Sequence, residues 1–154
     1  KAKVVQVKIL PKGHNVGYLL HYTCPEDTRI AIVPVGTADG LTGEHSDTGH
    51  VLIRGKRCRI VGVCCCEMMV DATDVPDAAV GDEVVLIGSQ NGTTLTAPDF
   101  AGMGNTTYTN VLAKTSLRNP KVYWKGGKLV GIDQFAAPFC DGDDSGDGGC
   151  GQTS

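Results

Sequence analysis

Short stretches of β-branched and other apolar residues recur about every ten positions along this chain. They lie at residues 4–10, 30–35, 50–53, 59–63 and 84–87, and Gly, Pro and Asp separate them. Alternating or short continuous apolar runs bounded by such residues are typical of β-strands. The pattern therefore predicts a mostly β fold, arranged as a small β barrel or sandwich.

Glycines and threonines indicate how these strands connect. Glycine adopts the positive φ that tight hairpin turns require, so residues 53–57 and 124–129 are predicted to be hairpins with their lysines in water. Thr96 can cap a helix whose first turn holds Pro98 and Asp99. A second short helix is predicted from about residue 107 to residue 115. One or two short helices thus complete the fold.

The composition changes from about Ala137 onward, where Gly, Asp, Ser and Cys replace apolar residues. Such a segment cannot bury enough apolar area to offset the entropy of ordering. We therefore expect a folded domain over residues 1–136 and a disordered tail over residues 137–154. Asp141, Asp143 and Ser145 match the opening of a calcium loop, but Gln152 stands where a bidentate Glu is expected. A calcium-binding β module is the weaker alternative.

Composition excludes several other classes of protein. The chain has 154 residues and carries 14 Lys and Arg against 17 Asp and Glu, so it lacks the basic excess of a nucleic-acid-binding protein. Without a ~20-residue apolar run or a signal peptide, no membrane contact is expected and the predicted location is the cytoplasm. Seven cysteines, three of them adjacent, match neither a disulfide framework nor a metal site. The chain starts at Lys1 without a methionine, which suggests that an upstream part is missing.

Three glycine-anchored segments occur in a characteristic order. They are Gly-Tyr at residues 17–18, Gly-Thr-Ala-Asp-Gly at 36–40 and Gly-Asp-Glu-Val-Val-Leu-Ile-Gly at 81–88. In this order and spacing, over roughly residues 2–124, the chain resembles the C-terminal β domain of alanine racemase. The resemblance implies a pyridoxal-phosphate-dependent isomerase that interconverts L- and D-alanine. It also implies a homodimer, in which this domain covers the mouth of the partner's N-terminal (β/α)₈ barrel and is inactive alone.

Racemisation removes the α proton from one face of an amino acid and returns a proton to the other, while the cofactor ring accepts electrons. In the family one base is a lysine in the barrel, which also binds the cofactor. The resemblance implies that Tyr18 is the other base. Tyr22 is the second candidate, since a single strand would leave both tyrosines on the same face. His14 and His21 are predicted to be surface or strand-edge residues.

Other positions depart from the family pattern. Family members usually carry a tyrosine at the position of Thr37, where it narrows the entrance for the substrate. The methionine whose backbone N–H receives the substrate carboxylate falls on Cys65 or Cys66, in a strand that is one residue shorter here. Glu67 replaces the family aspartate, and the arginine usual after residues 36–40 is missing.

Two further interpretations concern these segments. Asp39 and Gly40 are predicted to form a turn, with Asp bonding its own backbone and Gly supplying a positive φ. The three adjacent cysteines are expected to be inert small hydrophobes on a strand rather than nucleophiles. The departures from the family also favour one alternative function, a non-catalytic dimerisation or interaction module derived from a racemase.

Overall fold

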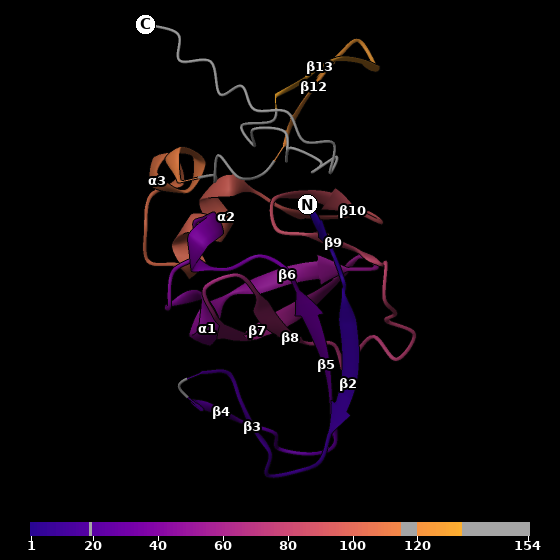
Figure 1. Ribbon diagram of the computed structural model, residues 1–154, viewed down its shortest axis with the longest axis vertical. Coiled ribbons are helices and arrows are strands. Elements are labelled where there is room, and N and C mark those ends of the chain that lie inside the picture. The colour runs from indigo at the N-terminus through magenta and orange to yellow at the C-terminus, as the bar shows by residue number, and fades with distance from the viewer. Residues whose placement is uncertain (19, 115–119, 134–154) are drawn as a thin grey trace, which may run out of the picture. The chain divides into compact units, whose positions relative to one another are not determined.

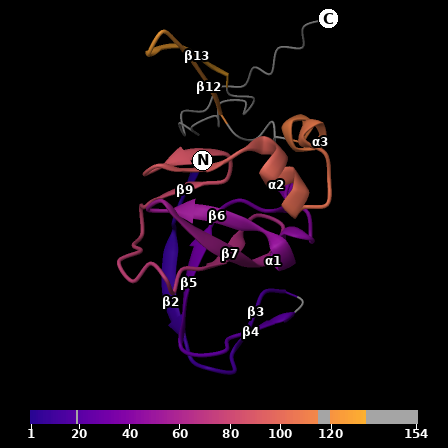
Figure 2. The same cartoon turned by 180° about the vertical axis from the view of Figure 1, so that it is seen from behind.

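The computed structural model describes residues 1–18, 20–114 and 120–133, shown in Figures 1 and 2. The chain separates into two compact units, Lys1–Ser116 and Leu117–Ser154. The boundary predicted after residue 136, the predicted disordered tail and the candidate calcium ligands all lie outside the described residues.

A seven-stranded antiparallel sheet forms most of the first unit. Its strands run in the order β1-β9-β6-β7-β8-β5-β2. They are β1 (Ala2–Lys3), β9 (Glu83–Val85), β6 (His50–Ile53), β7 (Lys56–Val63), β8 (Met68–Asp71), β5 (Thr28–Val33) and β2 (Gln6–Leu10).

The two edges of this sheet belong to one continuous segment, which makes the sheet curl. Only Val4 and Val5 separate β1 from β2. Val4 N donates to Asp82 O, beside β9, and Val5 N donates to Ile32 O on β5. The sheet therefore closes towards a half-barrel, which confirms the predicted mostly β, barrel-like class (Figure 1).

Alternate side chains of the strands fill the inside of the curled sheet. Along β7 the residues Cys58 and Ile60 are buried, whereas Arg57 and Arg59 are exposed, as the two-residue period of a strand requires. The α2 helix (Ala97–Met103) adds side chains to this core. Large members of the cluster are Val33, Val51, Ile53, Ile60, Met68, Val70, Val84 and Phe100.

A small hairpin packs on the outer face of the sheet. It consists of β3 (Asn15–Val16) and β4 (Tyr22–Thr23), and its Val16 lies in a second cluster with Cys24, Ile30 and Val61. Tyr18 lies in the loop of this hairpin and Tyr22 lies on β4. The two tyrosines therefore do not share one strand face, because the chain reverses direction between them.

The predicted helices and hairpins are present. Thr96 caps α2, and Thr107 caps α3 (Tyr108–Ala113) through Asn110 N. The β6–β7 turn holds Arg54 and Gly55 at φ 52° and 84°. In the second unit, β12 (Lys121–Lys125) and β13 (Lys128–Asp133) form the other hairpin, with exposed lysines at its turn.

Some elements were not predicted from the sequence. These are the β3–β4 hairpin, α1 (His45–Thr48), the 3₁₀ helix η1 (Thr37–Asp39), β8, and the small hairpin of β10 (Gly88–Gln90) and β11 (Thr93–Leu95). The predicted turn at Asp39 and Gly40 is confirmed, since Asp39 Oδ2 accepts from Gly36 N at 3.0 Å and Gly40 has φ 107°.

Candidate functional site

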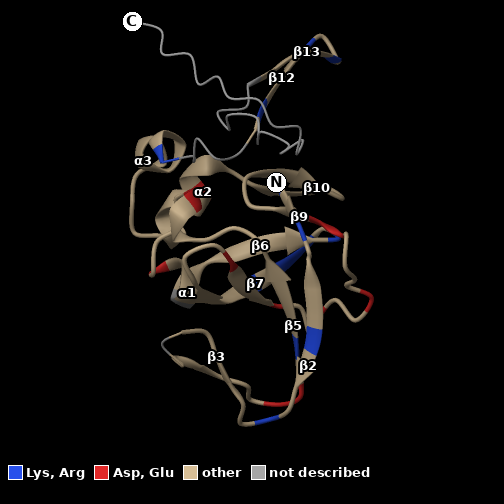
Figure 3. Cartoon of the chain, in the orientation of Figure 1, with Lys and Arg blue, Asp and Glu red and all other residues tan. Residues whose placement is uncertain are grey.

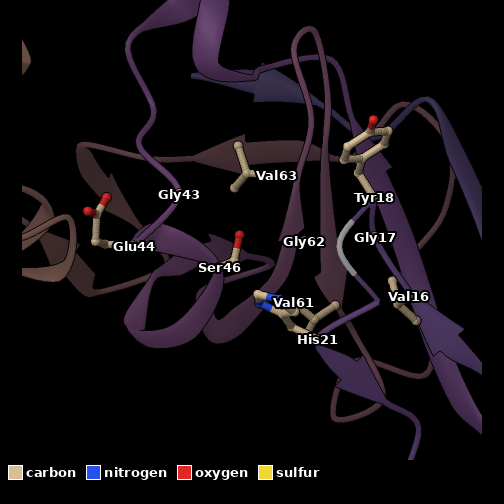
Figure 4. A pocket seen from close by; sticks show the side chains of 10 residues that line it. All are labelled: Val16, Gly17, Tyr18, His21, Gly43, Glu44, Ser46, Val61, Gly62 and Val63. Carbon is tan, nitrogen blue, oxygen red and sulfur yellow. The ribbon is translucent and has the colours of Figure 1, made fainter.

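A pocket of about 370 Å³ lies where the β3–β4 loop, β7 and the start of α1 meet (Figure 4). The end of β7 forms its floor. The loop of the small hairpin stands on one side and the start of α1 on the other. The lining residues are Val16, Gly17, Tyr18, His21, Gly43, Glu44, Ser46, Val61, Gly62 and Val63.

Two glycines allow the loop that carries Tyr18 to sit directly on β7. Gly17 has φ 82°, and a Cβ built on Gly62 would lie 3.2 Å from Gly17 Cα and 3.0 Å from Met69 Sδ. Glycine at both positions therefore permits a close backbone approach. As a result Tyr18 lies at the pocket, and the residue is 85% exposed.

Tyr22, the second candidate base, is engaged in the structure. Its hydroxyl donates to Asp71 Oδ2 at 3.0 Å, and the Arg59 guanidinium lies 5.7 Å from its ring centroid. Burial, together with the bond to Asp71, raises the pKa of Tyr22 to about 12. A phenol with this pKa is almost fully protonated at neutral pH, so Tyr22 is poorly suited to act as a base.

The adjacent cysteines form a turn, which corrects the expectation that they lie on a strand. β7 ends at Val63 and β8 begins at Met68, and Cys64 N donates to Glu67 O at 2.8 Å across the turn. We call residues 64–67 the β7–β8 tip. Cys65 and Cys66 are exposed there, and Cys64 is half-buried.

The segment that carries Thr37 holds this tip through backbone hydrogen bonds. Thr37 N donates to Cys64 O at 3.0 Å, and Ala38 N donates to Cys65 O at 2.9 Å. A Cβ on Gly36 would lie 2.4 Å from both of these carbonyl oxygens, so only glycine fits there. The structure thus brings Thr37 next to Cys65, although 28 positions separate them in the sequence.

These bonds also orient the amide groups of the β7–β8 tip. The C=O and N–H of a trans peptide point in opposite directions. Because the carbonyls of Cys64 and Cys65 face η1, the N–H groups of Cys65 and Cys66 point away from it. Neither N–H donates to any residue in the described part of the chain. Two neighbouring donors are therefore available to an acceptor from outside.

The predicted site residues lie in two groups in the structure. Tyr18 shares the pocket with Gly62 and Val63, whereas Thr37 and Cys65 meet at the β7–β8 tip. Val63 immediately precedes the tip in the chain, so both groups lie at the same end of β7.

His45 is a buried residue of this region that the sequence did not reveal. Its Nδ1 accepts from Thr42 N at 3.1 Å, and its ring lies 4.7 Å from the Phe100 ring. Gly104 packs against it so closely that a Cβ there would lie 2.1 Å from His45 Cε1. Burial lowers the pKa of His45. The histidine fixes α1, but local pattern cannot reveal it because Phe100 and Gly104 are distant in sequence.

A second pocket, of about 260 Å³, is lined by side chains of both charges, including Arg57, Arg59, Glu26, Asp71 and Asp74. Acidic and basic residues are likewise interspersed over the first unit in Figure 3.

Among the described residues there is no group of three His, Cys, Asp or Glu suited to a metal ion. No helix in the described ranges is long and apolar enough to cross a membrane.

Comparison with known proteins agrees with the resemblance. The family model described as alanine racemase, C-terminal domain, matches residues 1–123. Alanine racemase of Desulfosudis oleivorans is 45% identical over 127 residues, which are 82% of this chain and 33% of that protein. Alanine racemase of Clostridium kluyveri is 41% identical over 136 residues, covering 88% of this chain and 35% of that protein.

Solved structures give the same result. The alanine racemase of Bacillus anthracis with bound L-Ala-P superposes with a TM-score of 0.80 at 29% identity, over 87% of this chain and 34% of that one. The Clostridium difficile alanine racemase in complex with cycloserine superposes with a TM-score of 0.75 at 34% identity. The match covers 86% of this chain and 34% of that one. The chain spans about a third of the length of the relatives it matches. It belongs to the family of alanine racemase C-terminal domains.

Proposed function

We propose that this chain is the domain of a pyridoxal-phosphate-dependent alanine racemase that supplies Tyr18 as one of two bases. The racemase interconverts L- and D-alanine in the cytoplasm. It is a homodimer in which Tyr18 acts at the site of the partner's N-terminal (β/α)₈ barrel. The observation that carries this proposal is an exposed tyrosine at a pocket on a domain of this family.

The residues of the pocket suit the substrate side of such a site. None of the described residues that line it is a lysine, so a covalent link to the cofactor would come from the barrel. When bound, pyridoxal phosphate supplies an electron sink for the carbanion. The domain itself contributes a hydroxyl and backbone donors, and these groups bind or exchange protons.

Tyr18 would exchange a proton with the α carbon on one face of the amino acid. Its exposed side chain leaves the hydroxyl free to approach a substrate held by another domain. A tyrosine hydroxyl is a weak acid, so a cation in the barrel would be needed to favour its ionised form. The rigid approach of Gly17 to Gly62 sets the base of the loop.

The N–H groups of Cys65 and Cys66 would receive the substrate carboxylate. Two backbone donors at the end of a turn can bind both oxygens of a carboxylate, and hydrogen bonds to a charged acceptor are the strong ones. Backbone donors also tolerate a change of side chain, so cysteine can replace the methionine of other family members. Thr37 and Ala38 hold the opposite side of the same peptides.

Replacement of Tyr18 by Phe in the full-length enzyme tests the proposal. The change keeps the ring and removes the proton, so racemisation should fall by about 10²–10⁴-fold. The measurement is exchange of the substrate α proton with solvent deuterium, starting from each enantiomer. Tyr123→Phe in the second unit is the control. Equal exchange rates for the parent and Tyr18→Phe with both enantiomers would remove Tyr18 from the mechanism.

A further inference from the structure

We propose that Tyr22 is a positioning residue that, through Asp71, fixes the β3–β4 hairpin on the sheet and thereby sets the place of Tyr18. This inference rests on the proposed function of Tyr18 as a base. In this role Tyr22 keeps its hydroxyl proton and acts as a hydrogen-bond donor, whereas Tyr18 is proposed to exchange a proton with the substrate.

Tyr22 lies at the foot of the loop that carries Tyr18. Val16 and Tyr22 are the closing pair of the β3–β4 hairpin, and the described residues 17, 18, 20 and 21 lie in the loop between them. The Val16 side chain is buried against the outer face of the sheet, and the Tyr22 side chain packs against the same cluster. Any shift of Tyr22 therefore changes where the loop begins and ends.

Asp71 is a rigid acceptor for the Tyr22 hydroxyl. It ends β8, where it pairs with Ile30 on β5 and with Arg59 on β7, so it sits within the sheet and not at an edge. Its Oδ1 accepts from Thr73 N at 3.0 Å and from Thr73 Oγ1 at 2.6 Å. Thr73 Oγ1 in turn accepts from Arg29 N at 3.1 Å. Oδ2 is thus held in place for Tyr22, at 3.0 Å.

Arg59 adds a second contact, over the face of the Tyr22 ring. Its guanidinium lies 5.7 Å from the Tyr22 ring centroid, within the range of a cation–π interaction. The raised pKa of Tyr22, about 12, keeps its hydroxyl protonated, so it remains a hydrogen-bond donor at all moderate pH values. Tyr22 is therefore held by hydrogen bond, by packing and by charge.

The residues of this loop that the structure describes have few other contacts that hold them in place. Leu20 N donates to Gly17 O at 3.2 Å within the loop, and Gly17 rests on Gly62 through backbone contact alone. Tyr18 is 85% exposed and has no side-chain packing comparable to that of Tyr22. A displacement of about 1 Å at a reacting group can cost roughly 10²-fold in rate. Loss of the Tyr22–Asp71 hydrogen bond would therefore allow the loop to move and would displace Tyr18.

The first test is Tyr22→Phe in the full-length enzyme, which keeps the ring, its packing and the contact with Arg59 but removes the donor. We expect kcat to fall about tenfold, equivalent to about 1.4 kcal/mol, with KM for alanine changed by less than about twofold. Tyr123→Phe is the matched control and should keep the parent kcat. An unchanged kcat, or a change confined to KM, would overturn the proposal.

Changes at Asp71 separate positioning from a general loss of folding. Asp71→Asn keeps one acceptor oxygen, which can accept from Tyr22 or from Thr73 but not from both, so it should restore part of the kcat that Asp71→Ala loses. Because Tyr22 and Asp71 act as one pair, the double variant Tyr22→Phe/Asp71→Ala should be no slower than Asp71→Ala alone. Additive losses would contradict the pairing. Thermal unfolding of each variant shows whether the folded fraction is the same.

The position of Tyr18 can also be followed without any assay of activity. The protein is labelled with 3-fluorotyrosine, and the Tyr18 signal in the ¹⁹F NMR spectrum is assigned by its loss in Tyr18→Phe. We expect Asp71→Ala to shift or broaden that signal and Tyr123→Phe to leave it in place. A Tyr18 signal unaffected by Asp71→Ala would overturn the positioning role, even if Tyr18→Phe abolishes racemisation. Conversely, a racemase unaffected by Tyr18→Phe would refute the proposed function alone.

Discussion

The two turns that flank strand β7 are built in different ways. The β6–β7 turn at Arg54 and Gly55 has the positive φ at both residues that a two-residue hairpin turn favours, and Gly55 N donating to Gln90 Oε1 and Arg54 pairing with Asp82 support that local shape. The β7–β8 tip takes its shape from a distant segment, because Thr37 and Ala38 donate to the carbonyls of Cys64 and Cys65. The locally built turn is structural, and the tip held from a distance belongs to the candidate site.

This difference has a physical reason. A two-residue turn adopts a shape that its own residues favour, so its distant contacts only add to that shape, whereas a loop held through its carbonyls can present its N–H groups outward. At the β7–β8 tip the segment at residues 36–38 satisfies one side of the peptides and leaves the other side open. Support from elsewhere in the fold thus prepares a binding group that the loop alone would not hold in place.

Cysteines lie near both ends of β7, so the accessibility of the two turns can be compared through the rates at which their thiols are labelled. Cys58, close to the local turn, is buried and its pKa is raised to about 11, so about one thiol in a thousand is ionised at pH 8. Cys65 and Cys66 are exposed. A thiol reagent at pH 8 should therefore label them about a hundredfold faster than Cys58.

Cys140→Ser and Cys150→Ser in the same chain remove the cysteines of the tail from this labelling experiment, and peptide mass spectrometry identifies the labelled positions. Cys24, also buried, serves as an internal reference and should stay unlabelled until denaturant is added. Rapid labelling of Cys58 in the native protein would show that the locally built end of β7 opens as readily as the tip.

Gly36→Ala should break the support of the β7–β8 tip. The added Cβ would lie 2.4 Å from the carbonyl oxygens of Cys64 and Cys65, so backbone must move. We expect the free energy of unfolding to fall by about 3 kcal/mol, at the upper end of overpacking effects. Urea unfolding measures the change.

Gly102→Ala is the matched control for Gly36→Ala. Gly102 lies in α2, is exposed, and has nothing within 4 Å of an added Cβ. Alanine is the better helix former, so this variant should gain about 0.5–1 kcal/mol. If the two glycine variants change the stability alike, the close contact at Gly36 does not constrain the tip.

Thr37→Tyr changes a side chain next to the β7–β8 tip but keeps the backbone hydrogen bond that supports the tip. It therefore tests the role of the side chain separately from that of the backbone. Thr37 is exposed and holds the tip through its N–H alone. In the full-length enzyme an aromatic ring there would narrow the entrance. One methylene is worth about 1–3 kcal/mol in such a pocket, so kcat/KM for alanine relative to serine or lysine should rise about tenfold. A flat ratio would show that Thr37 does not line the entrance.

Acid should destabilise the region around α1, which also depends on distant contacts. Burial lowers the pKa of His45 below its value in the unfolded chain. The unfolded state therefore takes up a proton first, so stability is full above the unfolded pKa near ~6.5 and decreases as pH falls through and below it.

His45→Gln removes this titration and should flatten the slope of stability against pH between 7 and 5. The measurement is the urea midpoint at each pH, compared between the parent and the variant. Because the slope and not the absolute stability is compared, a packing defect in the variant does not affect the result. An identical slope in both proteins would mean that another group controls the acid response.

Local features of the sequence were sufficient for most elements of the fold. Strands β2, β5, β6, β7 and β9 of the curled sheet follow from apolar runs of the right length, the two hairpin turns from their glycines, α2 from the Thr96 cap, and α3 from the helix predicted near residue 107. In each case the residues that specify the element also lie within it. Tyr18 as a site residue came from resemblance to a family, because no property of its neighbours distinguishes it from any exposed tyrosine.

Tertiary structure alone decided the remaining features. The reversal of the chain between Tyr18 and Tyr22, the turn at Cys64–Glu67 and the burial of His45 all depend on partners far away in the sequence: Gly62 and Asp71, the segment at residues 36–38, and Phe100 with Gly104. Local propensity cannot encode such contacts, since they form only when the sheet has curled and brought distant segments together. The shape of the candidate site is therefore a property of the fold, whereas the strands that support it are properties of the sequence.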